Sequence, residues 1–581
     1  MTAPFPIIKE PPSVSTKHPA HIHPEEIVKG ITATEIEGAR IVFINMPLRQ
    51  SAQPTTTPEG PLLMATNLIR NYGVNASIID LNVYRNNGQY ISYEETFRLI
   101  QDHVRFHGEP HVVAFSGIIT TLRWQEAVAK MIRKIMPEAF LVSGNGLATE
   151  LKLGLFNFIP ELDGVAHSEG DDIILKIVYD AKIIKERGIK SAIASGKLAP
   201  YYLGEINGKH RFMYAGDRPN NLDGLPFADL ELIREDVHGY QILRRYLDTP
   251  VWGAGANNSS ATSFTMNQST TSVSSRGCPY GCKYCYRGAQ GERDWGIRSA
   301  KHIAQEIIRN IELYGVDFHG YPDDNFAVTV ARIRDLVPLL KPLGIRWGTH
   351  TRLDEAGGLV PRAGGKGEFG FEDPLRVKLM AEAGCIYIGF GPESAHPRTL
   401  EALGKGGFTL KAGLVTTKVN GITYDFPKAM LCGIKHSMEV GIHSNCTWIL
   451  ASPTETLVEL KQTVAFMKWQ EEYYQTLGVS RDAVNKRMFT LTWYPGTEMI
   501  RHPKVHTELS RVFGLKFDPI TFEPVCDENF HRYCLELDDA TKVLENPETG
   551  EPLNFGDMPT EQFLQAREYV DTGQTFKILD M

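Results

Sequence analysis

The stretch Ser275-Arg276-Gly277-Cys278-Pro279-Tyr280-Gly281-Cys282-Lys283-Tyr284-Cys285-Tyr286-Arg287 decides how the rest of the chain is interpreted. Its cysteines follow the spacing C-x-x-x-C-x-x-C. A four-iron cubane normally takes four thiolates, so three thiolates leave one iron open to a small molecule. The alternative is zinc, which prefers four ligands, and no fourth Cys or His lies close by in the sequence. The pattern therefore favours Cys278, Cys282 and Cys285 as ligands of a 4Fe–4S cluster.

Composition places this loop in an ordinary globular chain. The 581 residues are 42% apolar and 22% charged, which predicts about two to four domains. The net charge of −8 argues against a general nucleic-acid binder. No apolar run reaches the roughly 18 residues that span a membrane, and Met1 is not followed by a signal-peptide pattern. We expect a cytoplasmic protein with neither nucleic acid nor membrane as partner, and the few cysteines suit a reducing compartment.

Strand-like and helix-like patterns alternate in the first half of the chain. Helical spacing of apolar residues separates short apolar runs, as at Leu62, Ala65, Leu68 and Ile69. The runs lie at 41–45, 76–80, 111–115, 140–143 and 165–167. Such alternation predicts a doubly wound parallel sheet, which binds ligands at the carboxyl ends of its strands. Gly and Ser residues follow several of these runs.

The second half shows six further strand–helix units. Their strands are expected at 270–275, 316–320, 345–350, 385–391, 445–450 and 488–492. Six units suffice for a partial parallel barrel, whose chemistry lies on loops at the carboxyl ends of its strands. Two segments, 357–370 and 406–425, extend such loops and are either lids or surface decoration.

The predicted organisation has five parts. They are an N-terminal arm (1–37), a Rossmann-like domain (38–200), a connector (201–262), a barrel (263–500) and a small α+β C-terminal domain (501–581). Cys385, Cys432 and Cys446 lie on apolar patterns and are expected to be core thiols. Cys526 and Cys534 are too few for a second cluster.

The cysteine loop resembles the signature of the radical S-adenosylmethionine (SAM) enzymes, and the aromatic Tyr284 before the last cysteine also fits that family. The resemblance covers residues 265–500 and implies that the cluster's open iron chelates SAM. It places further SAM contacts at strand ends: Asp323, Asp324, Asn325, Arg352, Glu393 and Ser394. For Asp323, Asp324 and Glu393 the alternative is helix capping. The segment Ala451–Glu455 departs from the family's glycine-rich loop.

Residues 39–200 resemble the cobalamin-binding domain that precedes many radical SAM cores. The matching positions are Ser116, Gly117, Thr120, Gly144, Asn145, Gly146, Glu169 and Gly170. The D-x-H-x-x-G motif of another cobalamin class is absent, so no histidine of that motif ligates cobalt. The alternative is a flavodoxin-like domain without a ligand.

The resemblance implies a cobalamin-dependent methyltransferase that uses a 4Fe–4S cluster, SAM and cobalamin. It would methylate an unactivated carbon or phosphorus centre of a small metabolite or of a natural-product intermediate such as a peptide. It would take electrons from an external donor such as flavodoxin or ferredoxin. Two alternatives stay open. One is a non-methylating oxidation, cyclisation or rearrangement, and the other is an iron–sulfur sensing protein without radical chemistry.

Overall fold

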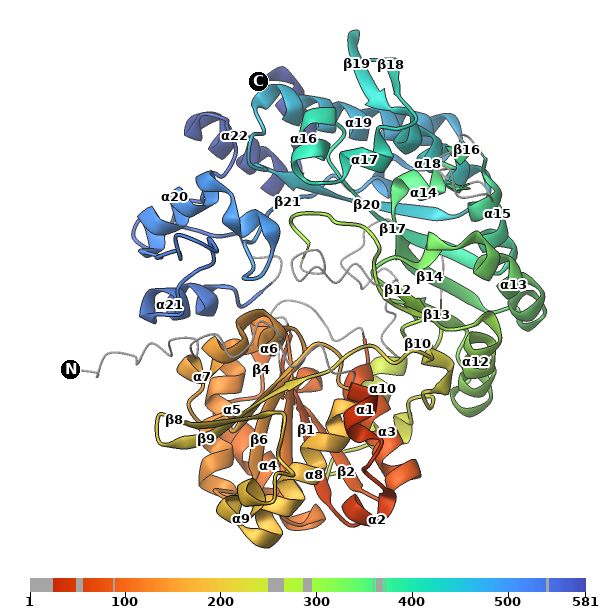
Figure 1. Cartoon of the computed structure of the whole chain (residues 1–581). Coiled ribbons are helices and arrows are strands. Elements are labelled where there is room, and N and C mark those ends of the chain that lie inside the picture. Colours follow the sequence, from red (N-terminus) through yellow and green to blue (C-terminus); the bar gives the residue numbers. More distant parts are fainter. Residues whose placement is uncertain are drawn as a thin grey trace. The chain divides into compact units, whose positions relative to one another are not determined.

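The computed structural model describes residues 24–48, 56–86, 89–248, 266–285, 295–358, 360–361, 369–370, 373–539 and 543–581. They form two compact units (Figure 1). The N-terminal unit comprises Met1–Pro54, Pro58–Arg245 and Phe513–Lys542, and the barrel unit comprises Thr55–Thr57, Tyr246–Val512 and Val543–Met581. The glycine-rich connector stretch 253–260, most of the loop 357–370 and Tyr286-Arg287 lie outside the described residues.

A seven-stranded sheet forms the core of the N-terminal unit. Its order is β2-β1-β5-β6-β7-β9-β8, and every neighbouring pair is parallel except β8 with β9. The strands are β1 (Arg40–Asn45), β2 (Asn75–Asp80), β5 (Val112–Ser116), β6 (Phe140–Gly144), β7 (Gly164–His167), β8 (Tyr202–Ile206) and β9 (Lys209–Ala215). This confirms the predicted Rossmann-like sheet. Strands β8 and β9, which fall in the predicted connector, extend it. The short pair β3 (Arg85–Asn86) and β4 (Gln89–Tyr90) stands apart from this sheet.

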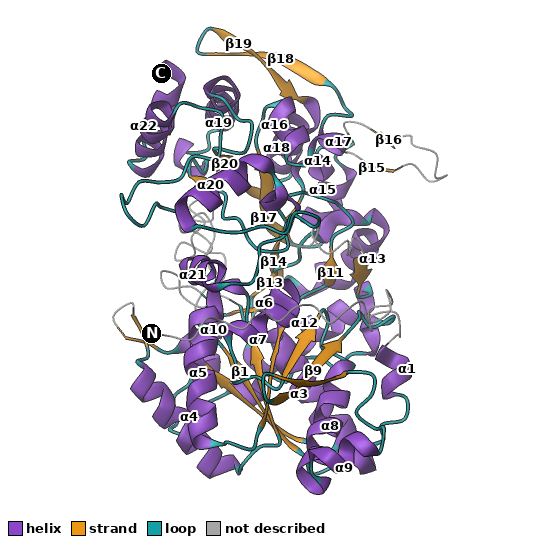
Figure 2. Cartoon of the chain, turned by 60° about the vertical axis from the view of Figure 1, so that its left-hand side comes forward, coloured by secondary structure: helices purple, strands orange, loops and turns teal. Residues whose placement is uncertain are grey.

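Helices cover both faces of this sheet (Figure 2). They are α1 (Pro24–Val28), α2 (Ala33–Ile36), α3 (Glu59–Tyr72), α4 (Tyr93–His107), α5 (Leu122–Ile135), α6 (Asn145–Leu151), α7 (Leu155–Phe158), α8 (Ile173–Arg187), α9 (Ile189–Ala194) and α21 (Glu528–Glu536). Local sequence sets their ends. Ser92 and Glu95 form a capping box at the start of α4. Gly73 ends α3 with φ 63°, a conformation that glycine adopts without strain.

The barrel unit contains six parallel strands in chain order, β10-β13-β14-β17-β20-β21. They are β10 (Ser269–Thr271), β13 (Phe318–Tyr321), β14 (Arg346–Thr351), β17 (Cys385–Glu393), β20 (His443–Leu450) and β21 (Met488–Thr490). An open sheet of six parallel strands in this order is the predicted partial barrel. Two-stranded pieces flank it: β11 (Ser275–Gly277) with β12 (Trp295–Ile297), and β15 (Val360–Pro361) with β16 (Phe369–Gly370).

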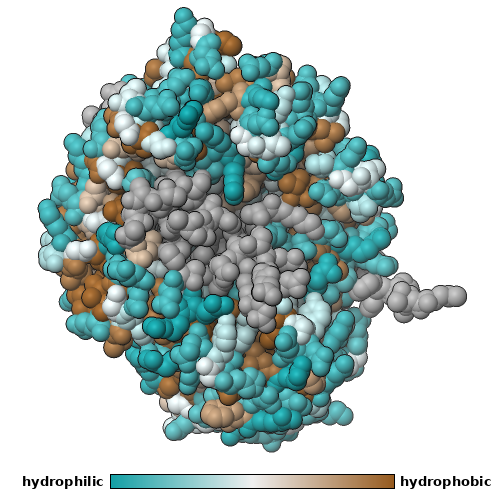
Figure 3. Space-filling model, turned by 180° about the vertical axis from the view of Figure 1, so that it is seen from behind, coloured by the Kyte–Doolittle hydropathy of each residue, from teal (hydrophilic) through white to brown (hydrophobic). Residues whose placement is uncertain are grey.

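The helices of this unit follow the strands that they connect (Figure 1). They are α12 (Ala300–Tyr314), α13 (Val330–Leu340), α14 (Leu353–Ala356), α15 (Leu375–Glu382), α16 (Pro397–Ala402), α17 (Gly406–Thr409), α18 (Lys428–Glu439), α19 (Leu457–Thr476), α20 (Pro503–Phe513) and α22 (Thr560–Asp571), with α10 (Ile242–Leu247) preceding the unit. In the described part of the chain no helix is both long and apolar enough to cross a membrane. Figure 3 shows hydrophilic and hydrophobic residues intermixed on the face that it draws.

The segment 406–425, predicted as a loop, is for the most part a β-hairpin. Strands β18 (Leu414–Val419) and β19 (Ile422–Pro427) pair in antiparallel register. Asn420 and Gly421 form the turn with φ values of 48° and 83°. Two successive positive φ angles fit a type I′ turn, which matches the twist of the strands it joins.

Candidate functional site

The cysteine loop begins where β11 ends, at Gly277, and is fixed to the barrel unit through its backbone. Lys283 donates its N–H to the carbonyl of Leu403 (3.0 Å) and accepts from the N–H of Met499 (3.0 Å). The N–H of Cys285 donates to the carbonyl of Cys282 (3.1 Å), which closes a turn between these two cysteines. The loop is thus held by backbone hydrogen bonds that are independent of its thiols.

All three cysteines of this loop are free thiols. Burial raises the pKa of Cys278 to about 12, and Cys282 lies near enough to contribute to that shift. As the side chains lie, no three His, Cys, Asp or Glu residues of the described ranges form a group that could hold a metal ion. The donor chemistry, three thiols on one anchored loop, fits an iron–sulfur cluster. Closure of the three sulfurs on one centre stays a prediction.

Asp323 fixes the strand that leads into the cysteine loop. Its carboxylate accepts the N–H of Ser274 (2.7 Å) and the hydroxyls of Ser274 (2.5 Å) and Ser275 (2.6 Å). Arg332 donates to the carbonyl of Ser274 (2.9 Å), and both charged side chains are buried. Burial raises the pKa of Asp323, while Arg332 opposes that shift. The Asp323 carboxylate therefore fixes Ser274 and Ser275, which lead into the cysteine loop, and it caps no helix.

The neighbouring positions divide between surface and interior. Asp324 is exposed, and it acts electrostatically on Cys278. Asn325 is buried, where it accepts from the Thr351 hydroxyl (2.6 Å) and donates to Glu355 (3.2 Å). Among the predicted contacts at this strand end, Asp324 thus presents its side chain to solvent, whereas Asn325 is engaged within the protein.

Arg352 lies directly against the cysteine loop. Its Nη1 is 3.7 Å from the sulfur of Cys282, and its guanidinium lies 4.3 Å from the ring centroid of Tyr280. Two hydrogen bonds to Asp354 (2.9 and 2.6 Å) fix the guanidinium plane. A bidentate carboxylate orients an arginine well, so Asp354 holds this cation beside the sulfur of Cys282.

Glu393 meets the same loop from the end of β17. Its carboxylate accepts the hydroxyl of Tyr284 (2.9 Å) and pairs with the ammonium of Lys405 (3.2 Å), which also donates to the carbonyl of Gly391. The backbone of Glu393 is left-handed, with φ 66°. Ser394 is buried and bonds to Thr463 (3.0 Å). Neither carboxylate nor hydroxyl caps the following helix, whose cap is His396.

Several residues of this site were not among the sequence predictions. Glu355 accepts from the Tyr280 hydroxyl (2.7 Å) as well as from Asn325 and Thr351, so it links the cysteine loop to two strand ends. Tyr280 stands inside the quoted stretch, and Glu355 follows Arg352 by three residues. Both residues lie close in the sequence to predicted site positions, and that proximity is a signal that could have found them.

The register of the barrel adds His350. His350 lies on β14 and pairs with Gly389 of β17, where a Cβ atom would lie 2.5 Å from the His350 Cδ2. The lack of a side chain at Gly389 therefore makes room for the His350 imidazole.

The loop that follows β20 is strained and holds a buried acid. Ala451 and Thr454 have φ values of 61° and 76°. The Glu455 carboxylate accepts the N–H of Ala451 (2.7 Å), and burial raises its pKa to about 8. A neutral Glu455 therefore supports a backbone shape that glycines would adopt more easily.

The N-terminal unit brings its predicted residues together at the carboxyl edge of its sheet. The Asn145 amide lies 3.3 Å from the Ser116 hydroxyl, and Thr120 donates to the carbonyl of Leu48 (3.0 Å). Asn145 has φ 68°, and Leu147 donates its N–H to the carbonyl of Gly117 (3.1 Å). Of the remaining predicted residues, Gly144 ends β6, Gly146 lies in the first turn of α6, and Glu169 and Gly170 follow β7.

Glycine is required by close packing at parts of this edge. A Cβ atom at Gly117 would lie 2.2 Å from the Thr121 hydroxyl, and one at Gly170 would lie 2.8 Å from the Met64 sulfur. Small residues and polar groups at strand ends suit a large planar cofactor. Its contacts with these residues stay a prediction.

Comparison with known proteins gives consistent results. The Radical SAM superfamily matches residues 272–467. The chain is 24% identical over 419 residues to an uncharacterized methyltransferase of Pyrococcus horikoshii, covering 72% of this chain and 74% of the relative. It is 23% identical over 227 residues to a cytidylyl-2-hydroxyethylphosphonate methyltransferase of Streptomyces wedmorensis, covering 39% and 36% of the two chains.

Two solved structures share the fold. One is the radical SAM methyltransferase TsrM from Kitasatospora setae with cobalamin and a 4Fe–4S cluster bound (TM-score 0.56, 13% identity, 93% of this chain and 89% of that chain). The other is the cobalamin-dependent SAM radical enzyme OxsB with aqua-cobalamin and SAM bound (TM-score 0.56, 15% identity, 84% and 64%). The chain thus contains a radical SAM domain, is similar in sequence to methyltransferases, and shares its fold with two cobalamin-dependent radical SAM enzymes.

Proposed function

We propose that the protein is a cobalamin-dependent radical SAM methyltransferase that acts on a small metabolite or a natural-product intermediate. The observation that carries this proposal is the three-cysteine loop, anchored beside the strand ends of a six-stranded half-barrel inside the region matched at 272–467. The names of the relatives, both methyltransferases, support methyl transfer over other outcomes.

Three cofactors are proposed: a 4Fe–4S cluster and cobalamin, which are bound in TsrM, and SAM, which is bound together with cobalamin in OxsB. When bound, the cluster and SAM supply a radical, and cobalamin supplies the methyl group that is transferred. The chain's own part begins with Cys278, Cys282 and Cys285, which would hold the cluster. Arg352 lies against Cys282, where its positive charge would face the cluster's ligand sulfur.

The barrel residues would bind and orient SAM. Glu393 is proposed to accept from the ribose, and because it already pairs with Tyr284 and Lys405, its position is fixed before SAM arrives. Asp324 presents an exposed carboxylate near Cys278, where it suits the amino group of SAM. Asp323 contributes by holding the loop in place, because its oxygens are already used by Ser274 and Ser275.

The carboxyl edge of the N-terminal sheet would bind the corrinoid. Ser116, Thr120 and Asn145 supply hydroxyl and amide groups there, and the glycines carry no side chain that would fill the space at this edge. We propose no histidine of the D-x-H-x-x-G type as cobalt ligand, because the sequence has no such motif. An external donor such as flavodoxin or ferredoxin would supply electrons.

Anaerobic reconstitution tests the proposal. Protein purified with cobalamin, iron and sulfide should carry about four irons and one cobalt per chain. Added reductant and SAM should yield 5′-deoxyadenosine, and SAM labelled with CD3 should transfer its label to the bound cobalamin. Cys282→Ala should lose iron and SAM cleavage. Cys432→Ala is the matched control, since this half-buried thiol lies on α18, outside the loop.

The outcomes separate the alternatives. A cluster that ignores SAM identifies an iron–sulfur sensor. Cleavage of SAM with bound cobalamin but no transfer of label identifies a non-methylating enzyme. Turnover retained in Cys282→Ala refutes the assignment of the cluster ligands.

A further inference from the structure

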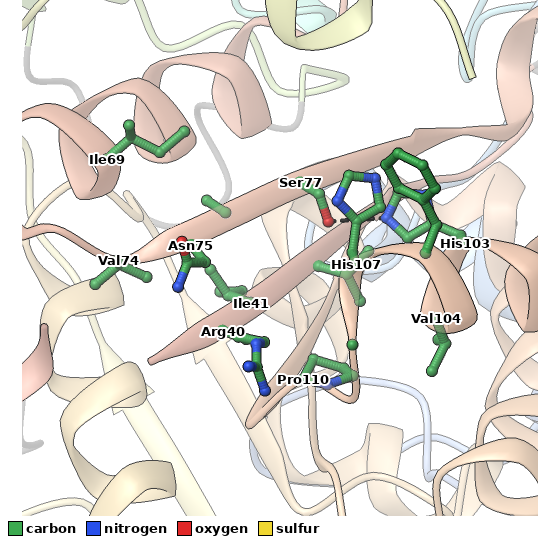
Figure 4. A pocket seen from close by; sticks show the side chains of 14 residues that line it. Arg40, Ile41, Ile69, Val74, Asn75, Ser77, His103, Val104, His107 and Pro110 are labelled. Carbon is green, nitrogen blue, oxygen red and sulfur yellow. Dashed lines mark hydrogen bonds between the residues drawn. The ribbon is translucent and has the colours of Figure 1, made fainter. Parts of the chain in front are cut away.

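A cavity lies at the amino-terminal edge of the sheet of the N-terminal unit (Figure 4). The starts of β1 and β2, the end of α3 and the last turn of α4 enclose about 480 Å³, and we call this the amino-edge pocket. Its residues include Arg40 and Asn75, the first residues of their strands. The predicted corrinoid contacts follow the opposite ends of parallel strands, so this pocket is separate from that edge. Its volume is typical of small-molecule sites.

Aromatic side chains form one side of the amino-edge pocket. The rings of His103 and His107, one helical turn apart on α4, have centroids 4.3 Å from each other. Phe106 lies edge-on to His107, with centroids 4.9 Å apart, and is 74% exposed. The exposed face of the Phe106 ring suits contact with a flat apolar ligand. Val74 and Ile69 add aliphatic surface.

The floor of the pocket is polar but neutral. His103 is buried, and its Nε2 lies 2.8 Å from the Ser77 hydroxyl (Figure 4). Burial, with a smaller contribution from His107, lowers the pKa of His103 to about 3, so the ring is uncharged at neutral pH. Because His103 is uncharged and hydrogen-bonded, the aromatic ring of a ligand can lie against it without carrying a charge.

Positive charge gathers at one end of the pocket. The Arg40 guanidinium folds over Gly108, where a Cβ atom would lie 3.3 Å from its Cζ. The N–H of Arg40 donates to Nδ1 of His111 (3.1 Å). Among the described residues that line the pocket, Arg40 is the only Lys or Arg, and none is an Asp or Glu.

We propose that the amino-edge pocket binds a small aromatic anion, whose carboxylate or phosphate pairs with Arg40 while its ring packs on His107 and Phe106. Arginine recognises both acids through its planar fork. The proposal is independent of the radical chemistry, because none of its residues belongs to the barrel unit or to the predicted corrinoid edge.

Fluorine NMR of the full-length protein tests the proposal. The probes are 4-fluorobenzoate, 4-fluorophenyl phosphate and, as the neutral match, 4-fluorobenzyl alcohol. At least one anionic probe should broaden on adding protein and the alcohol should not. Arg40→Gln should weaken binding by about tenfold or more, as expected for loss of a hydrogen bond to a charged group. Arg98→Gln, an exposed α4 arginine paired with Glu94, should bind like the native protein.

Each result decides the matter. Broadening that requires the anion and Arg40 supports the site, and the benzoate and phosphate arms name the preferred acid. Equal binding of the alcohol, equal binding by Arg40→Gln, or no broadening with any probe overturns it. Arg40 is exposed, so the variant is expected to fold.

Discussion

Replacing Asp323 tests whether one buried carboxylate holds the cysteine loop in place. In Asp323→Ala, three donors from Ser274 and Ser275 lose their charged acceptor, and the buried Arg332 loses a nearby negative charge. Leaving a buried donor unpaired costs about 1–3 kcal/mol, and because serine hydroxyls can rotate to other acceptors we expect a combined cost of about 3–5 kcal/mol. Because about 1 kcal/mol shifts the melting temperature of a large domain by roughly 2–4 °C, the barrel unit should melt about 6–20 °C lower.

Asp324→Asn is the matched control for this experiment. Asp324 is the next residue in the chain but is exposed, and surface substitutions usually change stability by less than about 0.5 kcal/mol. Asp324→Asn should therefore melt like the native protein, although it should weaken SAM binding if the proposed contact with the amino group is made.

Calorimetry and hydrogen exchange measure the Asp323 effect. Scanning calorimetry gives the melting temperature, and exchange mass spectrometry reports protection of peptides that cover β11 and the cysteine loop. Asp323→Ala should lose protection there first and should retain less iron after reconstitution. If it melts within about 1 kcal/mol of the native protein, or loses protection evenly over both units, Asp323 does not hold the loop and the reasoning from its hydrogen bonds is wrong.

Three further changes follow from the same geometry. Thr454→Gly should stabilise the barrel unit by about 1 kcal/mol in thermal unfolding, because Thr454 has φ 76° and glycine adopts such angles without strain; a destabilised variant would contradict this. The pKa of Glu455 is raised from 4.5 to about 8, so the native state binds a proton more tightly than the unfolded state and stability should fall as pH rises from about 4.5 to about 8; Glu455→Gln should flatten that slope, and an unchanged slope assigns it to other groups. Gly117→Ala should destabilise the N-terminal unit by about 1–3 kcal/mol, because its Cβ would lie 2.2 Å from the Thr121 hydroxyl, whereas Gly60→Ala, with open space around it, should not; equal denaturation midpoints for the two variants would refute the packing argument.

The sequence was sufficient for the fold where apolar pattern and topology agree. Short apolar runs separated by helical spacing became β1, β2 and β5 to β7, and six more became the half-barrel. Two features escaped. Strand β8, which is half-exposed at Tyr202–Ile206, and strand β9 fall in a segment whose prolines and glycine-rich stretch predict a connector. The segment 406–425 is predicted as a loop, although Asn420-Gly421 is a strong local signal for a type I′ turn.

Within the candidate site, sequence indicates which loops carry chemistry but not how each side chain is used. Asp323 and Asp324 are the same residue type at adjacent positions, yet one is buried against Arg332 and the other is exposed. Asp323 is buried because its side chain faces Ser274, which lies 49 residues away in the sequence. Glu355 likewise acquires its role from Tyr280, a partner 75 residues away. Such partners are set by tertiary packing, which neither motif nor periodicity encodes.

Several non-glycine residues with positive φ lie at the strand ends where the cofactors are proposed to bind. Among the described residues, the non-glycine positions with positive φ include two hairpin-turn asparagines, Asn207 and Asn420, where such angles are ordinary. Four others end or directly follow parallel strands, at Asn145, Ser168, Glu393 and Ala451, and Thr454 lies a few residues beyond β20. Lys152 and Phe522 also have positive φ but lie away from these strand ends. Each such conformation costs on the order of 1–3 kcal/mol and persists only where the surroundings impose it. Glycine would adopt these angles without strain, so the non-glycine residues at the strand ends are best explained by a requirement for particular side chains and loop shapes where the cofactors are proposed to bind.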